Sequence, residues 1–137
     1  MKWNDEYSIG IQEIDEQHKS LIGLLAEFEQ TVAGRAHWNT ILPLLMRIRE
    51  FAKFHFAVEE SLMQIISYPD FSAHRTEHQL LLEQIATLEH RVLRQEDKED
   101  LLKFLHSWLF EHILNNDQPF GRHALDKHAD LGRAKEK

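Results

Sequence analysis

One predicted helix of this 137-residue chain carries polar side chains where apolar core residues are expected. Between residues 41 and 66 the apolar residues recur in steps of three and four, which is the spacing of one face of an α-helix. Positions 55 and 59 on that face are occupied by His55 and Glu59. A buried carboxylate beside a buried imidazole is destabilising unless something pairs with both groups. The pair therefore predicts a further binding partner inside the core.

The apolar periodicity predicts four helices with short connections, over residues of about 11–33, 40–67, 71–93 and 98–116. This pattern is typical of an antiparallel up-down-up-down four-helix bundle. We therefore expect an all-α fold in which residues 1–137 form one domain, with an N-terminal arm and a short C-terminal tail. The fourth helix is expected to end around Asn115–Asp117, and the tail, which contains Pro119 and Gly121, to form a short helix near residues 123–127.

Histidines also interrupt the apolar faces of the other three predicted helices, at His18, His74, His78 and His112. A single histidine on an apolar face is usually a core residue with an ordinary hydrogen-bond partner, and a His-x3-His spacing alone is a weak metal signal. In an antiparallel bundle, however, these four histidines and the His55–Glu59 pair fall within one slab about 6–18 Å from the same end. Five imidazoles and a carboxylate at one level of a dry core indicate bound cations.

The amino-acid composition excludes several kinds of functional site and binding partner. The chain has no cysteine, which excludes a disulfide framework, thiolate metal sites and a cysteine nucleophile. Acidic residues outnumber basic ones by 23 to 16, with no run of Lys or Arg, which argues against nucleic acid or an anionic membrane as a partner. The N-terminus is polar and acidic, and no apolar segment approaches the ~20 residues that span a bilayer. We therefore expect a cytoplasmic protein without membrane insertion.

The number of candidate ligands indicates two metal ions. Five imidazoles and one carboxylate exceed the four ligands of a structural zinc site. Two adjacent dications need bridging anions, and Glu59 lies in the middle of the set. Asp117 is the available second carboxylate, but it follows His112 by five residues, about 140° around an ideal helix. Periodicity alone therefore does not place Asp117 in the site.

Taken together, the motifs resemble those of the hemerythrin family in its single-domain bacterial form. They are DEQHKSL (residues 15–21), HFAVEESLM (55–63), YP (68–69), HRTEH (74–78), and WLFEHI (108–113) followed by Asp117. The resemblance covers residues 3 to about 120, and it departs from the family at Gln118-Pro119-Phe120, near where a tyrosine is common. It implies a non-haem di-iron centre with an additional oxo or hydroxo bridge. It assigns His74, His78 and His112 to one iron, His18 and His55 to the other, and Glu59 and Asp117 as bridges to both.

The implied donor set favours reversible binding of dioxygen for storage, delivery or sensing. One iron would have six donors, whereas the other would have five and an open position for O2. A site rich in neutral imidazole holds Fe(II) well and provides few anions for higher oxidation states. Carboxylate-rich di-iron bundles use Glu-x2-His motifs, and none lies on these faces. We therefore expect a monomeric binding protein rather than an enzyme, with an oxygen-consuming enzyme as a candidate partner.

Alternative functions stay open at this point. A di-iron redox enzyme could act on peroxide, nitric oxide or ferrous iron at the same centre, and a sensor would pass a change at the helix ends to a partner. A role in repairing iron centres is disfavoured by the absence of cysteine. In the O2-binding interpretation, apolar neighbours of the ligands exclude water from the O2 pocket while also packing the core. The candidates for this wall are Leu21, Ile22, Phe56, Trp108, Leu109 and Ile113.

Overall fold

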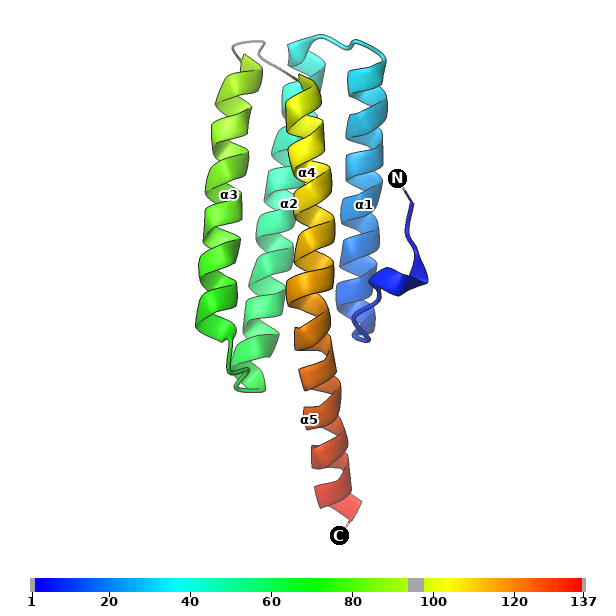
Figure 1. The fold of residues 1–137 in the computed structure, drawn as a ribbon, viewed down its shortest axis with the longest axis vertical. Coiled ribbons are helices and arrows are strands. Elements are labelled where there is room, and N and C mark those ends of the chain that lie inside the picture. Colours follow the sequence, from blue (N-terminus) through cyan, green and yellow to red (C-terminus); the bar gives the residue numbers. More distant parts are fainter. Residues whose placement is uncertain (1, 94–97, 137) are drawn as a thin grey trace.

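The computed structural model describes residues 2–93 and 98–136, and every regular element within them is helical. In chain order the elements are η1 (Asp5–Tyr7), α1 (Gln12–Ala33), α2 (Trp38–Ile65), α3 (Phe71–Leu93), α4 (Lys98–His112), η2 (Ile113–Asp117) and α5 (Gln118–Glu136). Figure 1 shows α1 to α4 side by side and alternating in direction, with α5 extending past the bundle from the end of α4. The predicted four-helix bundle is therefore confirmed.

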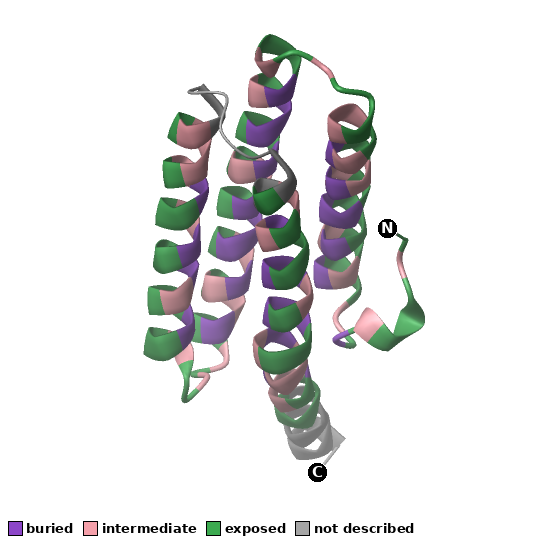
Figure 2. Cartoon of the chain, turned by 45° about the horizontal axis from the view of Figure 1, so that its top comes forward, coloured by how far each residue is buried: buried purple, intermediate pink, exposed green. Residues whose placement is uncertain are grey.

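The bundle buries one apolar face of each long helix, as the purple inner faces in Figure 2 show. Far from the level of the inward-facing histidines, the core contains four apolar side chains without exposed surface: Leu25, Leu45, Ile85 and Leu105. Each such side chain contributes roughly 1.5–3 kcal/mol through burial. This apolar part of the core thus stabilises the helical scaffold that positions the inward-facing histidines. Among the described residues, no helix is both long and apolar enough to cross a membrane.

Helix α2 begins at Trp38, two residues before its predicted start. The imidazole of His37 caps it, because His37 Nδ1 accepts a hydrogen bond from the Asn39 backbone N–H at 3.4 Å. Pro43 is the sixth residue of the helix, so it lies past the first turn and its missing N–H removes the bond that would go to the Asn39 carbonyl. The helix ends at Ile65, and Ser67 then adopts a left-handed conformation with φ 53° in the turn toward α3.

The prediction of a short tail with a helix near residues 123–127 is wrong. Instead, α5 runs from Gln118 to Glu136 and continues α4 through the π-helical turn η2. In that turn the Gln118 N–H bonds to the Ile113 carbonyl, five residues back rather than four. Pro119 follows directly, so the change of hydrogen-bond register in η2 falls at the point where the chain has no N–H to donate. Phe120 anchors the junction, since it is fully buried with its ring 5.3 Å from that of Tyr68.

Candidate metal centre

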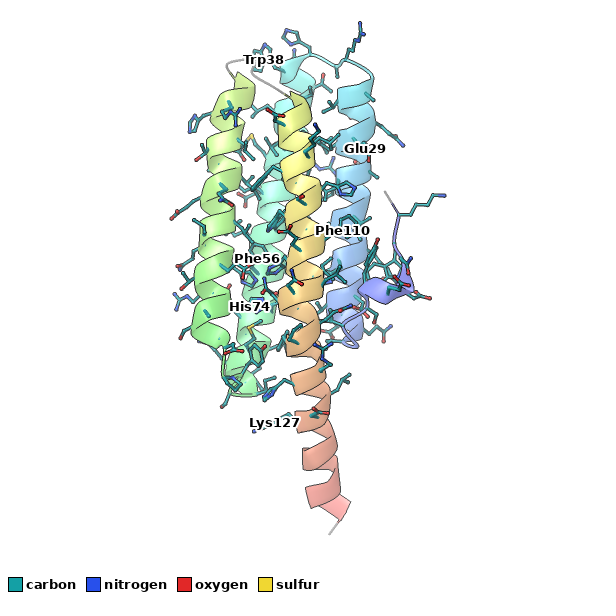
Figure 3. The ribbon with its side chains drawn as sticks, viewed as in Figure 1. Glu29, Trp38, Phe56, His74, Phe110 and Lys127 are labelled. Atoms are coloured by element: carbon teal, nitrogen blue, oxygen red, sulfur yellow. The ribbon has the colours of Figure 1, made fainter. Side chains whose placement is uncertain are left out.

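The structure brings all seven candidate ligands together in the half of the bundle nearest α5. They come from every helix of the bundle and from the π-turn, and none is more than 5% exposed: His18 on α1, His55 and Glu59 on α2, His74 and His78 on α3, His112 at the end of α4, and Asp117 in η2. Figure 3 shows His74 and Phe56 at this level between the helices. The side chains that broke the apolar faces in the sequence therefore meet one another.

The π-turn explains how Asp117 joins the cluster. Five residues along an ideal α-helix would place it about 140° away from His112. The wider turn of η2, with its bond from Gln118 N–H to Ile113 O, brings a residue five positions along back toward the same face. As a result, Asp117 Oδ1 lies 3.1 Å from His112 Nε2. π-turns are rare and are frequently found at functional sites.

Glu59 lies between two groups of histidines. Its Oε1 atom is 2.6 Å from Nε2 of His55 and 3.5 Å from Nε2 of His18. Its other oxygen, Oε2, is 3.3 Å from Nε2 of His78 and 3.6 Å from Nε2 of His74. One carboxylate therefore presents one oxygen to each side of the cluster.

Asp117 repeats this division. Its Oδ2 atom lies 3.0 Å from Nε2 of His18, whereas Oδ1 lies 3.1 Å from Nε2 of both His74 and His112. The cluster thus separates into a three-histidine group and a two-histidine group that share both carboxylates. The three-histidine group is His74, His78 and His112, and the two-histidine group is His18 and His55.

The donor atoms satisfy one another poorly as hydrogen-bonding groups, which is the observation that favours cations. Despite complete burial, seven nitrogen and oxygen atoms of the candidate ligands have no partner in hydrogen-bond geometry: His18 Nδ1, His18 Nε2, His55 Nε2, Glu59 Oε1, Glu59 Oε2, His78 Nδ1 and Asp117 Oδ2. In the three-histidine group, the Nε2 atoms of His78 and His112 face each other at 3.2 Å. Metal–nitrogen bonds in proteins are about 2.1 Å, so adjacent ligands of one ion lie roughly 3 Å apart. The residues present therefore fit a pair of metal ions.

A polar side chain orients the outer nitrogen of His55, and carboxylates lie near those of His78 and His112. The Nδ1 atom of His55 lies 2.7 Å from the Gln17 side-chain oxygen, which can only accept, so Nδ1 donates to Gln17 and Nε2 is directed toward the cluster. On the other side the contacts are carboxylates at longer range, 3.5 Å from His78 Nδ1 to Glu60 and 3.6 Å from His112 Nδ1 to Glu77.

Sequence periodicity did not predict these outer partners. Gln17 precedes His18 in the chain but contacts His55 on a different helix, so periodicity gives it no role. Glu60 and Glu77 likewise adjoin the candidate ligands Glu59 and His78 in sequence. The signal that could have found them is a polar residue directly beside a ligand and one position off the apolar face.

Proton binding is strongly perturbed in the metal-free site. Burial lowers the pKa of His18 and of His74, but the adjacent carboxylates of Asp117 and Glu59 outweigh it and raise each pKa to about 9. Burial alone would raise the pKa of Glu59 and Asp117, yet the neighbouring imidazoles hold both values below their usual range. At neutral pH, protons on the imidazoles therefore provide the positive charge that the buried carboxylates require, and a metal ion would displace them.

The surroundings of the cluster are mainly apolar. The six candidate wall residues are all buried, with none more than 5% exposed: Leu21, Ile22, Phe56, Trp108, Leu109 and Ile113. The Phe56 ring stacks on the imidazole of His78 with centroids 3.9 Å apart and planes 6° apart. Trp108 in turn meets Phe56 edge to face at 6.0 Å. This packing fixes the ring of His78 and leaves little room for water beside it.

Solvent approaches the cluster on the three-histidine side. A surface cavity of about 380 Å³ between α3 and α4 is lined by residues that include Glu77, Trp108, His112 and Asn116. Glu77 accepts a short hydrogen bond from the Asn116 amide, and its pKa is lowered chiefly by the adjacent imidazole of His112. Protons leaving His112 thus have a carboxylate beside them at the surface.

Comparisons with known proteins agree with this geometry. Residues 9–124 match the family model described as the hemerythrin HHE cation binding domain. The chain is 34% identical over 116 residues to a bacteriohemerythrin of Pseudomonas aeruginosa (strain LESB58), covering 84% of this chain and 75% of that protein. It is also 34% identical over 121 residues to a bacteriohemerythrin of Stenotrophomonas maltophilia (strain R551-3), covering 86% and 77% of the two chains.

The fold comparison leads to the same group of proteins. A crystal structure of wild-type hemerythrin matches with a TM-score of 0.82 and 28% sequence identity. The match covers 90% of this chain and 97% of that one. The sequence match over residues 9–124 contains every candidate ligand. The chain therefore belongs to the hemerythrin family.

Proposed function

We propose that this protein binds O2 reversibly at a non-haem di-iron centre, for oxygen storage, delivery or sensing. The observation that carries the proposal is the division of both carboxylates between two groups of histidines. Glu59 directs one oxygen toward His55 and the other toward His78, and Asp117 divides its oxygens between His18 and His112 in the same way. Such an arrangement suits two adjacent cations rather than one.

The two groups would hold their ions unequally. The three-histidine group offers three imidazoles and an oxygen of each carboxylate, whereas the two-histidine group offers two imidazoles and the same two bridges. With a solvent-derived bridge, the first ion has six donors and the second has five. Two ferrous ions held in this way would supply two electrons and one open coordination position for O2.

The protein's own part is to hold the donors and to keep water away. Gln17 holds His55 with Nε2 directed inward, and the stack on Phe56 holds His78. Leu21 and Ile22, one turn beyond His18, and Ile113, next to His112, contribute buried apolar surface near the site. We assign these side chains to the wall of the O2 pocket, where exclusion of water and reductants keeps bound O2 from being consumed.

The proposal favours a carrier over an enzyme because the ligand set is rich in neutral imidazole and has only two carboxylates. We further propose that the protein acts as a cytoplasmic monomer that supplies an oxygen-consuming enzyme. An enzyme acting on peroxide, nitric oxide or ferrous iron would instead consume its substrate continuously when a reductant is present.

The test is an iron count together with absorption spectra. The metal-free protein is loaded anaerobically with Fe(II) and desalted, and the iron per chain is measured. Spectra are then recorded under argon, after addition of O2, and again after argon, over several cycles. We expect two irons per chain and an absorption band that appears with O2 and disappears with argon. Irreversible oxidation on first exposure, or sustained turnover with a reductant, would contradict the proposal.

A further inference from the structure

The N-terminal arm, residues 3–10, is attached to two segments of the fold at once. On α1, the Asp15 carboxylate accepts hydrogen bonds from the Ile9 backbone N–H at 2.8 Å and from the Ser8 hydroxyl at 2.5 Å. On α5, the Gln118 side-chain amide donates to the carbonyls of Glu6 at 2.6 Å and of Ser8 at 3.4 Å. The arm thus connects the start of α1 to the start of α5.

The backbone of the arm also approaches α5 too closely for a side chain between them. Gly121 is buried, and a Cβ atom added there would overlap the carbonyl group of Ile9. Ile9 itself is only 4% exposed, so it cannot move outward without losing its place in the core. Gly10 adopts φ 86° beside Leu125, which a residue with a side chain would rarely do. The observed position of the arm therefore depends on glycine at positions 10 and 121.

Both attachment points adjoin candidate metal ligands. Asp15 lies three residues, nearly one helical turn, before His18, and Gln118 directly follows Asp117. Across the joint, His18 Nε2 and Asp117 Oδ2 face each other at 3.0 Å. Asp117 also depends on the π-turn, in which the Gln118 N–H makes the bond to Ile113. The starts of α1 and α5, which both form hydrogen bonds with the arm, thus also bring His18 and Asp117 together.

We propose that the N-terminal arm is a positioning element for the two-histidine metal position, acting through His18 and Asp117. The inference rests on the proposed function, since it presumes that the site holds two metal ions. Asp117 serves both positions, but His18 belongs to the two-histidine position alone. The three-histidine group depends less on the arm, because His74 and His78 come from α3, whereas the arm is attached to α1 and α5. Loosening the arm should therefore weaken one metal position more than the other.

The test compares two Gly→Ala variants in helices. Gly121→Ala introduces the overlap with Ile9, whereas a Cβ atom at Gly23 in α1 meets nothing within 4 Å, so Gly23→Ala is the matched control. Gln118→Met is a milder variant that keeps the side-chain length and removes the donor to the Glu6 and Ser8 carbonyls. Equilibrium dialysis with Co²⁺ measures how many ions bind and how tightly, and the visible Co²⁺ spectrum reports the ligand geometry.

The weaker Co²⁺ position is the two-histidine group, which offers fewer donors. In Gly121→Ala we expect its affinity to fall about ten- to hundredfold, as is typical when support behind a ligand is removed. The tighter position should change less, Gln118→Met should shift in the same direction, and Gly23→Ala should bind like the original chain. If Gly121→Ala does not fold, Gln118→Met alone decides the question.

Two results would overturn the inference without touching the proposed function. One is a lower melting temperature of the metal-free variants with both Co²⁺ affinities and the spectrum unchanged, which would make the arm merely structural. The other is an equal weakening of both positions. Failure of the original chain to bind two Co²⁺ ions would instead overturn the proposed function, and the inference with it.

Discussion

Replacing Glu59 with glutamine is the most direct test of the bridging arrangement. The change keeps the size of a side chain that has no exposed surface, and it removes one negative charge from between the two groups of histidines. Glutamine can offer one oxygen to one group, but its NH2 group then faces the other, where Oε1 now lies 2.6 Å from His55 or Oε2 lies 3.3 Å from His78. We therefore expect Glu59→Gln to lose the paired metal site.

The expected magnitude follows from Coulomb's law. A single pair of unit charges about 4 Å apart interacts by ~4 kcal/mol at an effective dielectric constant near 20. Glu59 would interact with two dications, so one such interaction is a lower bound. Each 1.4 kcal/mol is a factor of ten in affinity, so the affinity for at least one ion should fall by roughly 10³-fold or more.

The assay measures Fe(II) bound per chain after anaerobic loading and desalting, together with the Co²⁺ affinity of the same variant. Glu111→Gln is a suitable control, because it makes the same chemical change beside His112 on an exposed residue. The control should keep two irons, and Glu59→Gln should not. Retention of two irons with unchanged affinity in Glu59→Gln would refute the reasoning that this carboxylate bridges two ions.

Three further predictions concern the outer hydrogen-bond partners and the protons of the site. Gln17→Leu should lower the affinity of the two-histidine position about ten- to hundredfold in Co²⁺ dialysis, because the Nδ1 proton of His55 loses its acceptor; unchanged affinity would rule out an orienting role. Metal uptake at pH 7 should release protons, detectable with a pH indicator, because the pKa of His18 and of His74 is about 9 in the metal-free site. Affinity should then rise between pH 7 and 9 and fall in acid, and a flat pH profile would contradict this assignment. The metal-free protein should also lose stability as pH rises through about 9. A histidine whose pKa is raised by folding stabilises the folded state fully below its unfolded pKa of about 6.5, and this stabilisation is lost as the pH rises above its folded pKa. It amounts to about 1.4 kcal/mol for each unit by which the pKa is raised. Urea unfolding at pH 7 and pH 10 measures it, and a higher free energy of unfolding at pH 10 would show that the sign is wrong.

Local periodicity was sufficient to predict much of this protein. Steps of three and four in the sequence define the inward face of a helix, because side-chain direction repeats every 3.6 residues. The six candidate ligands His18, His55, Glu59, His74, His78 and His112 could be assigned to inward faces for that reason, and short connections then implied an antiparallel bundle that places them at one level.

Tertiary structure alone decided the features that depart from this periodicity. Asp117 reaches the cluster only because η2 changes the hydrogen-bond register of the last helix, and the same change lets the chain pass Pro119 and continue as α5. Gln17 supports His55 from another helix, at a distance that no spacing within one helix encodes. The fit of Ile9 against Gly121 likewise joins two ends of the chain. Sequence periodicity reports the regular helix, whereas a change of helical register and contacts between distant segments are determined when the whole bundle packs.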